Sequence, residues 1–292
     1  MAVNLPIDKI IFSTVEEAEQ EVENALECDV LYYYGEIRTG YTPIFRDVVE
    51  QIAERQGKRD AIGICLTTPG GQVEAVENMV EILRHHYDYL YAIVPRSAMS
   101  AGTILCMAAD KIFMDYSSSL GPIDPQVPDR ENKNLVPALG YLDKVKELID
   151  KSLNNTISPA EFHMLQNQDL AMLRFYEQSR ELSVSLLKDW LTKYKFKDWT
   201  HHRTNNPGEP VTADEKKLRA EEIATMLSNN NIWHSHGRMI SMSRLKNDMK
   251  LEIEDFGMNI AHRDAIRRYS QTLTNHLERQ GIPVYMYNRH VH

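Results

Sequence analysis

The sequence predicts an α/β fold in which strands and helices alternate around a mainly parallel sheet. Residues 30–35, 61–67 and 89–94 are short apolar segments rich in β-branched or aromatic side chains, which is typical of buried strands. Segments with helical periodicity separate them, and this alternation predicts parallel strands because each helix carries the chain back across the sheet. Additional helices are predicted in the C-terminal half.

Capping signals and periodicity place the helices of the N-terminal half. Thr14 and Glu17 have the spacing of a capping box, so the first helix is expected to run from Thr14 to about Leu26. Residues 44–55 predict a second helix. A third is expected over 72–86, where the apolar residues fall on one helical face, at Val73, Val76, Met79, Val80 and Leu83.

A buried helix and a long loop follow. Residues 101–109 are apolar on every side, which predicts a buried helix, and residues 111–115 predict a short strand. Residues 117–142 contain the polar run DRENKN and four prolines, which is typical of a long ordered loop. These prolines are Pro122, Pro125, Pro128 and Pro137.

Helix signals return after the loop. Ser158, Pro159 and Glu161 combine an N-cap, a proline at the first helical position and a capping glutamate. The helix that they begin is expected to continue without a break to about Tyr194. The polar, proline-bearing residues 195–212 then predict a soft domain boundary near residue 200.

That boundary divides the chain into two parts. Residues 1–200 are expected to form the core with a long helical arm, and residues 201–292 a C-terminal helical extension packed on it. The extension is predicted to hold a capped helix over 212–227, a short strand at 250–255 and an amphipathic helix over 258–279. The tail YMYNRHVH gives no clear signal.

Composition excludes several classes of protein. The chain is 42% hydrophobic with a net charge of −9, which argues against a broad nucleic-acid or anionic-membrane surface. Its longest apolar stretches fall well short of the roughly 20 residues of a membrane span, and no signal peptide is recognisable. Three cysteines in apolar surroundings, Cys28, Cys65 and Cys106, favour buried thiols in a reducing compartment. A cytoplasmic location is expected.

Two strand-to-helix turns carry the candidate chemistry. Gly70 and Gly71 in TTPGG follow the second strand, and Ser100 in SAMSAGT follows the third. Both turns open at the same edge of a parallel sheet, which is where such sheets bind ligands. There the amides of Gly71 and Ala101 can hold the oxyanion that forms when Ser100 attacks a carbonyl. Taken singly, each motif also fits a structural turn or a serine N-cap.

Five motifs in order resemble the ClpP and signal-peptide-peptidase-A serine peptidases of the ClpP/crotonase fold, and most closely the serine dehydrogenase proteinase (SDH) family. They are YYYGEI, LTTPGG, PRSAMSAGT, AADKIFMD and LGPIDPQ, with a weaker continuation through IWHSHGRMIS. The resemblance covers roughly residues 30–255. It implies a cytoplasmic serine endopeptidase with Ser100 as nucleophile and Gly71 and Ala101 as oxyanion donors.

The same resemblance implies the surroundings of the site. Gly70 and Asp124 are expected beside the bound peptide or protein substrate, and no cofactor or metal is expected. A homo-oligomer is implied because such peptidases usually enclose their sites in rings or stacked assemblies. Whether an ATP-driven partner delivers the substrate is left open by the sequence.

The general base is the weakest part of the resemblance. ClpP has a histidine about two dozen residues after the serine, whereas Asp124 stands near that position here and residues 87–162 contain no histidine. Signal peptide peptidase A uses a lysine further on, which implies Lys144 as the preferred base, with Lys146 and Lys151 as alternatives. A lysine acts as a base only where burial lowers its pKa. Asp124 then either orients the base or caps a turn.

Two histidines of WHSHGR are further candidates. On an extended backbone His234 and His236 face the same side, so that one more ligand would complete a zinc site. No third ligand and no CxxC or HExxH spacing is identifiable. A structural role is therefore favoured over a role near the active site, and metal binding is the least favoured of the three.

Two other functions fit the same fold. A crotonase-type enzyme acting on acyl-CoA uses paired amide donors without a nucleophilic serine. A non-catalytic scaffold that has lost its base is the other alternative, and the missing ClpP-type histidine keeps it open.

Overall fold

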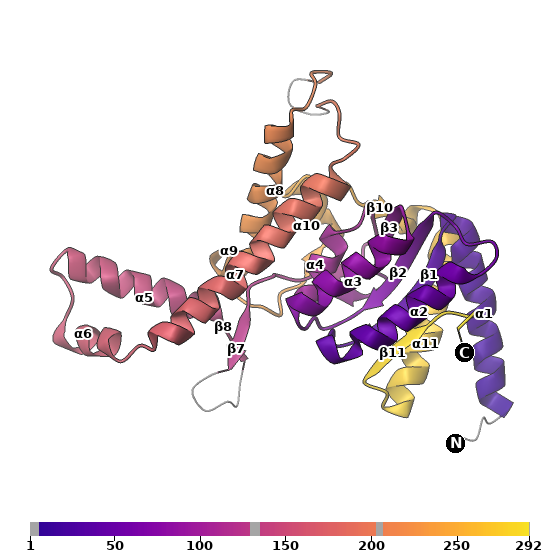
Figure 1. Cartoon of the computed structure of the whole chain (residues 1–292), viewed down its shortest axis with the longest axis horizontal. Coiled ribbons are helices and arrows are strands. Elements are labelled where there is room, and N and C mark those ends of the chain that lie inside the picture. Colours follow the sequence, from indigo (N-terminus) through magenta and orange to yellow (C-terminus); the bar gives the residue numbers. More distant parts are fainter. Residues whose placement is uncertain (1–5, 129–134, 203–206, 292) are drawn as a thin grey trace.

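The computed structural model describes residues 6–128, 135–202 and 207–291. Its centre is a six-stranded sheet in the order β10-β5-β3-β2-β1-β11 (Figure 1). All neighbouring strands are parallel except β1 and β11, so the prediction of a mainly parallel sheet is confirmed. The strands are β1 (Asp29–Gly35), β2 (Ala61–Thr67), β3 (Tyr89–Ile93), β5 (Lys111–Met114), β10 (Glu254–Asp255) and β11 (Val284–Tyr287).

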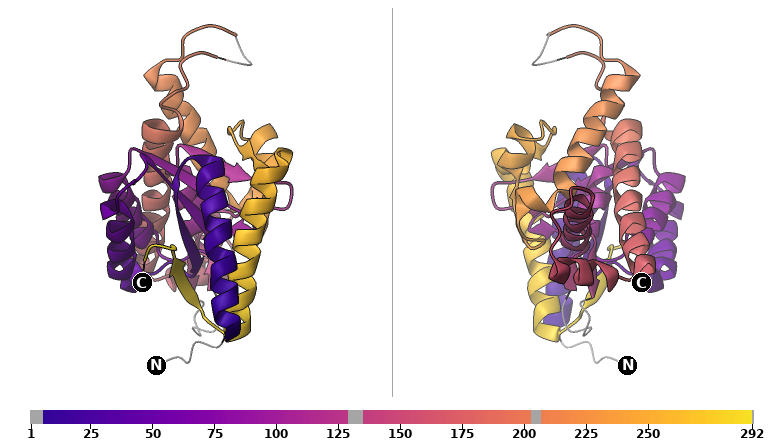
Figure 2. Two further views of the ribbon diagram at one scale, coloured as in Figure 1. Left: turned by 90° about the vertical axis from the view of Figure 1, so that its right-hand side faces the viewer. Right: turned by 90° about the vertical axis from the view of Figure 1, so that its left-hand side faces the viewer.

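Helices cover both faces of this sheet. One face carries α2 (Thr42–Glu54), α3 (Val73–His86) and α4 (Ala101–Met107), and the other carries α1 (Pro6–Leu26) and α11 (Ile260–Gln280), which lie side by side (Figure 2). Successive residues of β1 point to opposite faces. Leu31 and Tyr33 join the core under α2 and α3, whereas Val30 and Tyr32 join the core under α1 and α11. Both faces are therefore buried, as parallel strands require.

A second, small sheet joins three segments that are far apart in the sequence. It consists of β4 (Ser97–Ala98), β6 (Ser119–Leu120) and β9 (Ile240–Ser241), in the order β4-β6-β9. β4 and β6 are parallel, and β6 and β9 are antiparallel. Residues that follow β4 and β6 and residues that precede β9 therefore leave the sheet at the same end.

A helical arm projects from the body. The hairpin of β7 (Gln126–Pro128) and β8 (Leu135–Pro137) leads into α5 (Ala138–Leu153) and α6 (Pro159–Gln166), which stand away from the sheet (Figure 1). α7 (Leu170–Trp190) runs back along the body and packs against α8 (Ala213–Ser228). The shorter helical elements are η1 (Thr39–Tyr41), the π-helical η2 (Leu191–Lys195), α9 (Asn230–Trp233), α10 (Met242–Asn247) and η3 (Phe256–Met258).

The predicted start of the first helix is wrong. α1 begins at Pro6, and Thr14 lies inside it with its hydroxyl donating to the carbonyl of Ile10 at 2.9 Å. A threonine within a helix can satisfy its hydroxyl on the carbonyl four residues earlier. The spacing of Thr14 and Glu17 is therefore not a capping box here.

The predicted continuous helix from residue 158 to 194 is also wrong. Its start is confirmed, since Ser158 and Glu161 form a full capping box at the beginning of α6. However, α6 ends at Gln166, and Asp169 accepts hydrogen bonds from the amides of Ala171 and Met172 at the start of α7. The N-cap at Asp169 therefore begins a new helix, although the spacing of apolar residues predicts a single one.

The C-terminal third supplies strands as well as helices. Residues 207–291 contribute β9 to the small sheet and β10 and β11 to the two edges of the large one. The tail that gave no sequence signal forms β11, whose partner is β1. The capped helix predicted over 212–227 is confirmed as α8, with Thr212 and Glu215 completing the capping box.

The three cysteines, Cys28, Cys65 and Cys106, are all buried and unpaired, as predicted. Burial raises the thiol pKa of Cys28 and of Cys106 to about 12.

Across the part of the chain that the structure describes, every helix is too short or too polar to cross a bilayer.

Candidate active site

Ser100 stands at a sharp turn between β4 and α4. Its backbone has φ 51° and ψ −118°, a region that residues with a side chain rarely adopt. The Ser100 side chain makes no capping bond to α4, so the N-cap role is not the one it fills. A strained turn of this kind holds a nucleophile clear of the backbone at the edge of a sheet.

The neighbouring turn after β2 fits closely against this serine. Gly70 has φ +107°, and a Cβ atom built there would lie 2.7 Å from the Ser100 Cβ and 3.3 Å from the Ala101 nitrogen. Gly71 has φ +146°, and its Cβ would lie 2.0 Å from the carbonyl oxygen of Ile37. Glycine is therefore required at both positions, and the turn at Gly70 lies directly against Ser100 and Ala101.

The amides beside the serine are free to bind an anion. The strand-like contact between Ile37 and Gly71 uses the Gly70 carbonyl and the Gln72 amide, and not the Gly71 amide. Ala101 is the first residue of α4, where an N–H group has no partner within the helix. Neither the Gly71 nor the Ala101 amide donates a hydrogen bond to any residue that the structure describes.

Thr103 ties the serine turn to the segment that follows β6. Its Oγ1 atom lies 2.9 Å from the carbonyl oxygens of both Ala98 and Gly121, and it accepts a hydrogen bond from the Gly121 amide at 2.9 Å. A Cβ built on Gly121 would lie 2.6 Å from the Met99 side chain. The segment leading to Asp124 therefore passes directly beside the residue that precedes Ser100.

Asp124 and His236 form a pair in this region. The Nδ1 atom of His236 lies 2.9 Å from Asp124 Oδ1, and Gln126 Nε2 donates to Asp124 Oδ2 at 3.0 Å. The Asp124 side chain is 1% exposed and that of His236 is 23% exposed. His236 Nε2 has no partner among the described residues. A buried carboxylate that holds one imidazole nitrogen while the other is left unpaired is the arrangement of a general base and its orienting acid.

The small sheet places these two residues and Ser100 at one end. Ser100 follows β4 by two residues, Asp124 follows β6 by four, and His236 precedes β9 by four. β9 is antiparallel to the other two strands, so all three residues leave the sheet at one end. Pairing between residues this far apart leaves no local signal, and the sequence could show His236 only as one histidine of WHSHGR.

His234 and His236 are separated by the backbone. The sequence predicts an extended segment, but His234 has φ 62°, in the left-handed region. The His234 side chain is exposed, whereas that of His236 is half-buried. The buried Trp233 anchors the segment, and its Nε1 donates to the Met226 carbonyl at 2.7 Å. Within residues 6–128, 135–202 and 207–291, no three His, Cys, Asp or Glu side chains gather as metal ligands would.

The candidate lysine bases all lie on the arm. Lys144 is 57% exposed and pairs with Glu147 at 2.9 Å. Lys151 pairs with Glu147 and Glu161 at 3.0 and 2.6 Å, and Lys146 is exposed. Lys144 and Lys151 thus have carboxylate partners, and all three lysine side chains are exposed or, for Lys151, part-exposed. The structure does not bring Lys144 into the apolar surroundings that the lysine hypothesis needs.

One buried lysine occurs elsewhere in the fold. Burial lowers the pKa of Lys195 to about 8, and its Nζ donates to the Asp110 carbonyl at 3.1 Å. Asp110 directly precedes β5 and therefore lies at the amino ends of the strands. Ser100 lies beyond their carboxyl ends, so Lys195 belongs to the opposite edge of the sheet.

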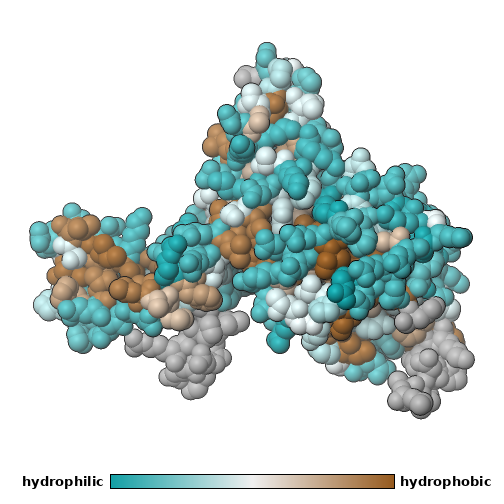
Figure 3. Space-filling view, viewed as in Figure 1, coloured by the Kyte–Doolittle hydropathy of each residue, from teal (hydrophilic) through white to brown (hydrophobic). Residues whose placement is uncertain are grey.

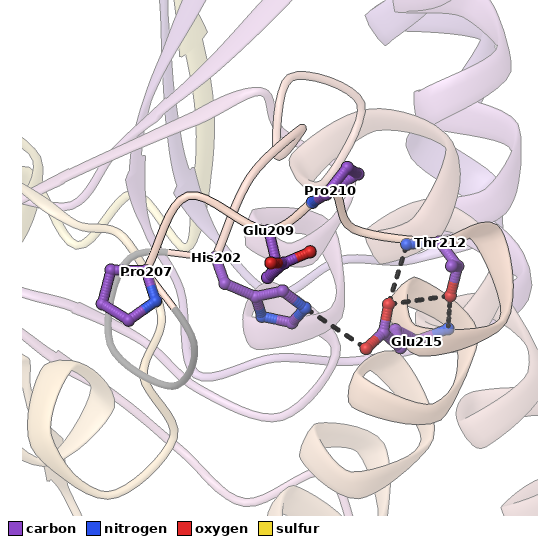
Figure 4. A pocket seen from close by; sticks show the side chains of 6 residues that line it. All are labelled: His202, Pro207, Glu209, Pro210, Thr212 and Glu215. Atoms are coloured by element: carbon purple, nitrogen blue, oxygen red, sulfur yellow. Dashed lines mark hydrogen bonds and ion pairs between the residues drawn. The ribbon is translucent and has the colours of Figure 1, made fainter.

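A surface cavity of about 800 Å³ lies apart from the serine, at the start of α8 (Figure 4). His202 and Glu215 meet there at 3.2 Å, and the Thr212 hydroxyl is occupied by the capping box. These hydrogen bonds stabilise the turn before α8, and the lining side chains provide no free nucleophile. The turn at Ser100 is therefore kept as the candidate site.

Comparison with known proteins places the chain among related sequences. Two uncharacterized proteins of Methanocaldococcus jannaschii are similar: one is 31% identical over 58% of this chain and 55% of its own length. The other is 34% identical over 32% of this chain and 31% of its own length. The chain thus spans about half the length of the first relative and about a third of the second.

Solved structures include similar folds. A serine-to-alanine mutant of the 1510-N membrane-bound stomatin-specific protease matches 78% of this chain and 79% of its own, with 15% identity and a TM-score of 0.45. A lysine-to-alanine mutant of the same protease, in complex with a substrate peptide, matches 78% and 75%, with 17% identity and a TM-score of 0.45. ClpP1 from Listeria monocytogenes matches 86% and 96%, with 14% identity and a TM-score of 0.40.

A family model matches residues 46–230, which hold the glycine turn, Ser100 and Asp124. This match covers more than half of the chain and agrees with the resemblance that the order of the motifs indicated. The chain belongs to the family of ClpP-like SDH-type serine proteinases.

Proposed function

We propose that the protein hydrolyses peptide bonds with Ser100 as nucleophile, His236 as general base and Asp124 as the acid that orients it. The observation that carries this proposal is the Asp124–His236 pair, which leaves the small sheet at the same end as Ser100. His236 takes the place of Lys144, the base implied by the resemblance to signal peptide peptidase A. Lys144 is exposed and paired with Glu147, so its side chain lies outside the buried surroundings that a lysine base needs.

The first half of the reaction forms an acyl-enzyme. With its Nδ1–H donating to Asp124, His236 accepts the hydroxyl proton of Ser100 on Nε2 while the Ser100 Oγ bonds to the substrate carbonyl carbon. The carbonyl electron pair moves to oxygen, where the amides of Gly71 and Ala101 stabilise the negative charge. When the tetrahedral intermediate collapses, the C–N bond breaks and His236 gives its proton to the leaving amine.

The second half releases the acid. Water replaces the amine, His236 takes a proton from it, and the hydroxide attacks the ester carbonyl in the same oxyanion site. Collapse of this intermediate breaks the bond to the Ser100 Oγ, which recovers the proton from His236. The reaction involves no oxidation or reduction, and no cofactor takes part.

Labelling with a fluorophosphonate tests this assignment without a known substrate. Intact mass should show one adduct on the wild type and none on Ser100→Ala. His236→Ala should slow labelling by up to roughly 10⁶-fold, the order seen when the histidine of a triad is removed. Lys144→Ala serves as the matched control and should label at the wild-type rate.

The other outcomes assign other functions. Loss of labelling in Lys144→Ala with retention in His236→Ala would restore the Ser–Lys dyad. A wild type that does not label at all, while its turn remains folded, would favour the scaffold. Thioester hydrolysis that survives Ser100→Ala would favour a crotonase-type enzyme.

The arm supports an oligomer. Large apolar side chains gather over α5 and α6 (Figure 3), and α6 buries none of its residues. We propose that a second copy of the chain covers this surface, in line with the closed assemblies implied by the resemblance. The side chains include Leu153 (76% exposed) on α5 and Met164 (58%) on α6, and the surface continues onto the start of α7 with Leu170 (78%) and Phe175 (55%).

Analytical ultracentrifugation tests the oligomer. The double change Leu170→Glu and Phe175→Glu should convert the assembly to a smaller species. Leu218→Glu is the control, because Leu218 is 59% exposed on α8, outside the arm. A wild type that sediments as a monomer would overturn this part of the proposal.

A further inference from the structure

Gln126 lies on the far side of Asp124 from His236. Its Nε2 donates to Asp124 Oδ2 at 3.0 Å, while His236 Nδ1 lies 2.9 Å from Oδ1. Asp124 is 1% exposed, so water cannot replace a lost donor at little cost. Each carboxylate oxygen thus has its own partner, and the two bonds together fix the plane of the carboxylate.

The backbone around Gln126 is held at the base of the arm. Gln126 is the first residue of β7 and pairs with Pro137 in β8. The carbonyl of Pro125 accepts the amide of Ala138, the first residue of α5, at 2.9 Å. The backbone of Gln126 is therefore held by the hairpin, and this fixes the position from which its side-chain amide donates to Asp124.

We propose that Gln126 is a positioning residue for the peptidase reaction: it fixes Asp124, and through Asp124 the imidazole of His236. This inference rests on the proposed triad. Gln126 does not touch the substrate in this role. Without its donor, the Asp124 carboxylate can rotate about its last torsion, and the imidazole loses its alignment with Ser100.

Two variants of similar size separate this role from packing. Gln126→Met keeps the length of the side chain and removes the donor. Gln126→Glu can donate to Asp124 only when it is protonated, and the neighbouring carboxylate raises the pKa of such a glutamate. A purely structural role would not make the defect of the glutamate variant depend on pH.

The test is the pH dependence of the second-order rate constant for fluorophosphonate labelling of Ser100 in the full chain. Gln126→Met should lower it by about 10-fold at every pH, less than the roughly 100-fold cost of a 1 Å misplacement. For Gln126→Glu, the ratio of variant to wild-type rate should fall by about 10-fold between pH 5 and 8, as the donor is lost. Gln168→Met is the matched control, since Gln168 is half-buried on the arm and donates to the Met164 carbonyl.

The outcomes separate this inference from the proposed function. If His236→Ala loses labelling while both Gln126 variants label within twofold of the wild type at all pH values, the positioning role is overturned and the triad stands. If His236→Ala labels like the wild type, the triad fails and the role of Gln126 fails with it. An equal loss in Gln126→Met and Gln126→Glu at every pH would assign Gln126 to packing instead.

Discussion

The two edges of the large sheet use polar groups in opposite ways. At the amino ends of the strands, charged groups are buried and paired: Asp29 accepts from the Arg55 guanidinium, from the Arg59 amide at 3.2 Å and from the Tyr87 hydroxyl at 3.0 Å. Beyond the carboxyl ends, Ser100 is strained and the Gly71 amide is unused. The cluster at Asp29 satisfies its polar groups internally, whereas the turns at Gly71 and Ser100 leave donors for a ligand.

Two strongly perturbed titrating groups lie toward the edge that the proposed reaction does not use. Burial raises the pKa of Glu19 to about 8 and lowers that of Lys195 to about 8. Glu19 is bonded to Asn288, which donates to the carbonyl of Val30 near the start of β1, and Lys195 donates to the Asp110 carbonyl before β5. A shifted pKa therefore indicates burial first and function only where the geometry agrees. In this fold, the combination of a strained backbone with free amides distinguishes the turn at Ser100, since a positive φ alone also occurs at Asn155 and His234.

The largest effect is expected from Ser100→Gly, which acts on activity and stability in opposite directions. Labelling should fall by roughly 10⁴-fold or more, since the nucleophile is gone. Glycine adopts a positive φ without strain, so the free energy of unfolding should rise by about 1 kcal/mol. Urea denaturation and intact mass measure the two effects.

Asn155→Gly is the control for this prediction. Asn155 also has a positive φ, 55°, and lies in an exposed turn of the arm. It should gain stability and keep its labelling. A Ser100→Gly protein that is less stable than the wild type would contradict the interpretation of this turn as strained.

Asp29→Ala tests the opposite edge. It leaves the Arg55 guanidinium and the Tyr87 hydroxyl without their shared acceptor, so the free energy of unfolding should fall by about 3 to 5 kcal/mol, as for a broken buried ion pair. The labelling rate of the protein that remains folded should not change. A loss of labelling that exceeds the loss of folded protein, measured by circular dichroism, would show that the two edges are coupled.

Gly70→Ala tests the fit between the two turns. The added Cβ would lie 2.7 Å from the Ser100 Cβ, so we expect labelling to fall by about 100-fold, the scale of a 1 Å displacement. Gly57→Ala is the matched control, because Gly57 also has a positive φ, +80°, but nothing lies within 4 Å of its added Cβ. Equal labelling of the two variants would contradict close packing of the turn against Ser100.

The sequence was sufficient for features that depend on neighbouring residues and insufficient for those that join distant ones. The glycine turn, the turn at Ser100 and the capping boxes at Ser158 and Thr212 are local, so the residues themselves specify them. The pair of Asp124 and His236 depends on β9 lying antiparallel to β6, which no local pattern encodes.

The absence of a signal for the strand at residues 284–287 has the same physical origin, because its pairing partner, β1, is near the other end of the chain and no local pattern predicts the pairing. The burial of a lysine on α5 likewise depends on where this helix lies in space and not on its distance from Ser100 along the chain. Tertiary contacts, and not propensity, decide both cases.

The smallest effect is expected from Glu19→Gln and concerns pH. Glu19 is fully buried, with the Tyr269 hydroxyl donating at 2.8 Å and the Asn288 amide at 3.0 Å, and burial raises its pKa from 4.5 to about 8. Between these values the folded chain keeps a proton that the unfolded chain has lost, so its contribution to stability disappears as pH rises. From pH 5 to 8 the wild type should lose at least about 1.4 kcal/mol more than Glu19→Gln, the equivalent of one pKa unit. Glu17→Gln, on an exposed position of the same helix, should follow the wild type in urea denaturation, and a Glu19→Gln curve parallel to both would mean that Glu19 is ionised in the folded protein at pH 5.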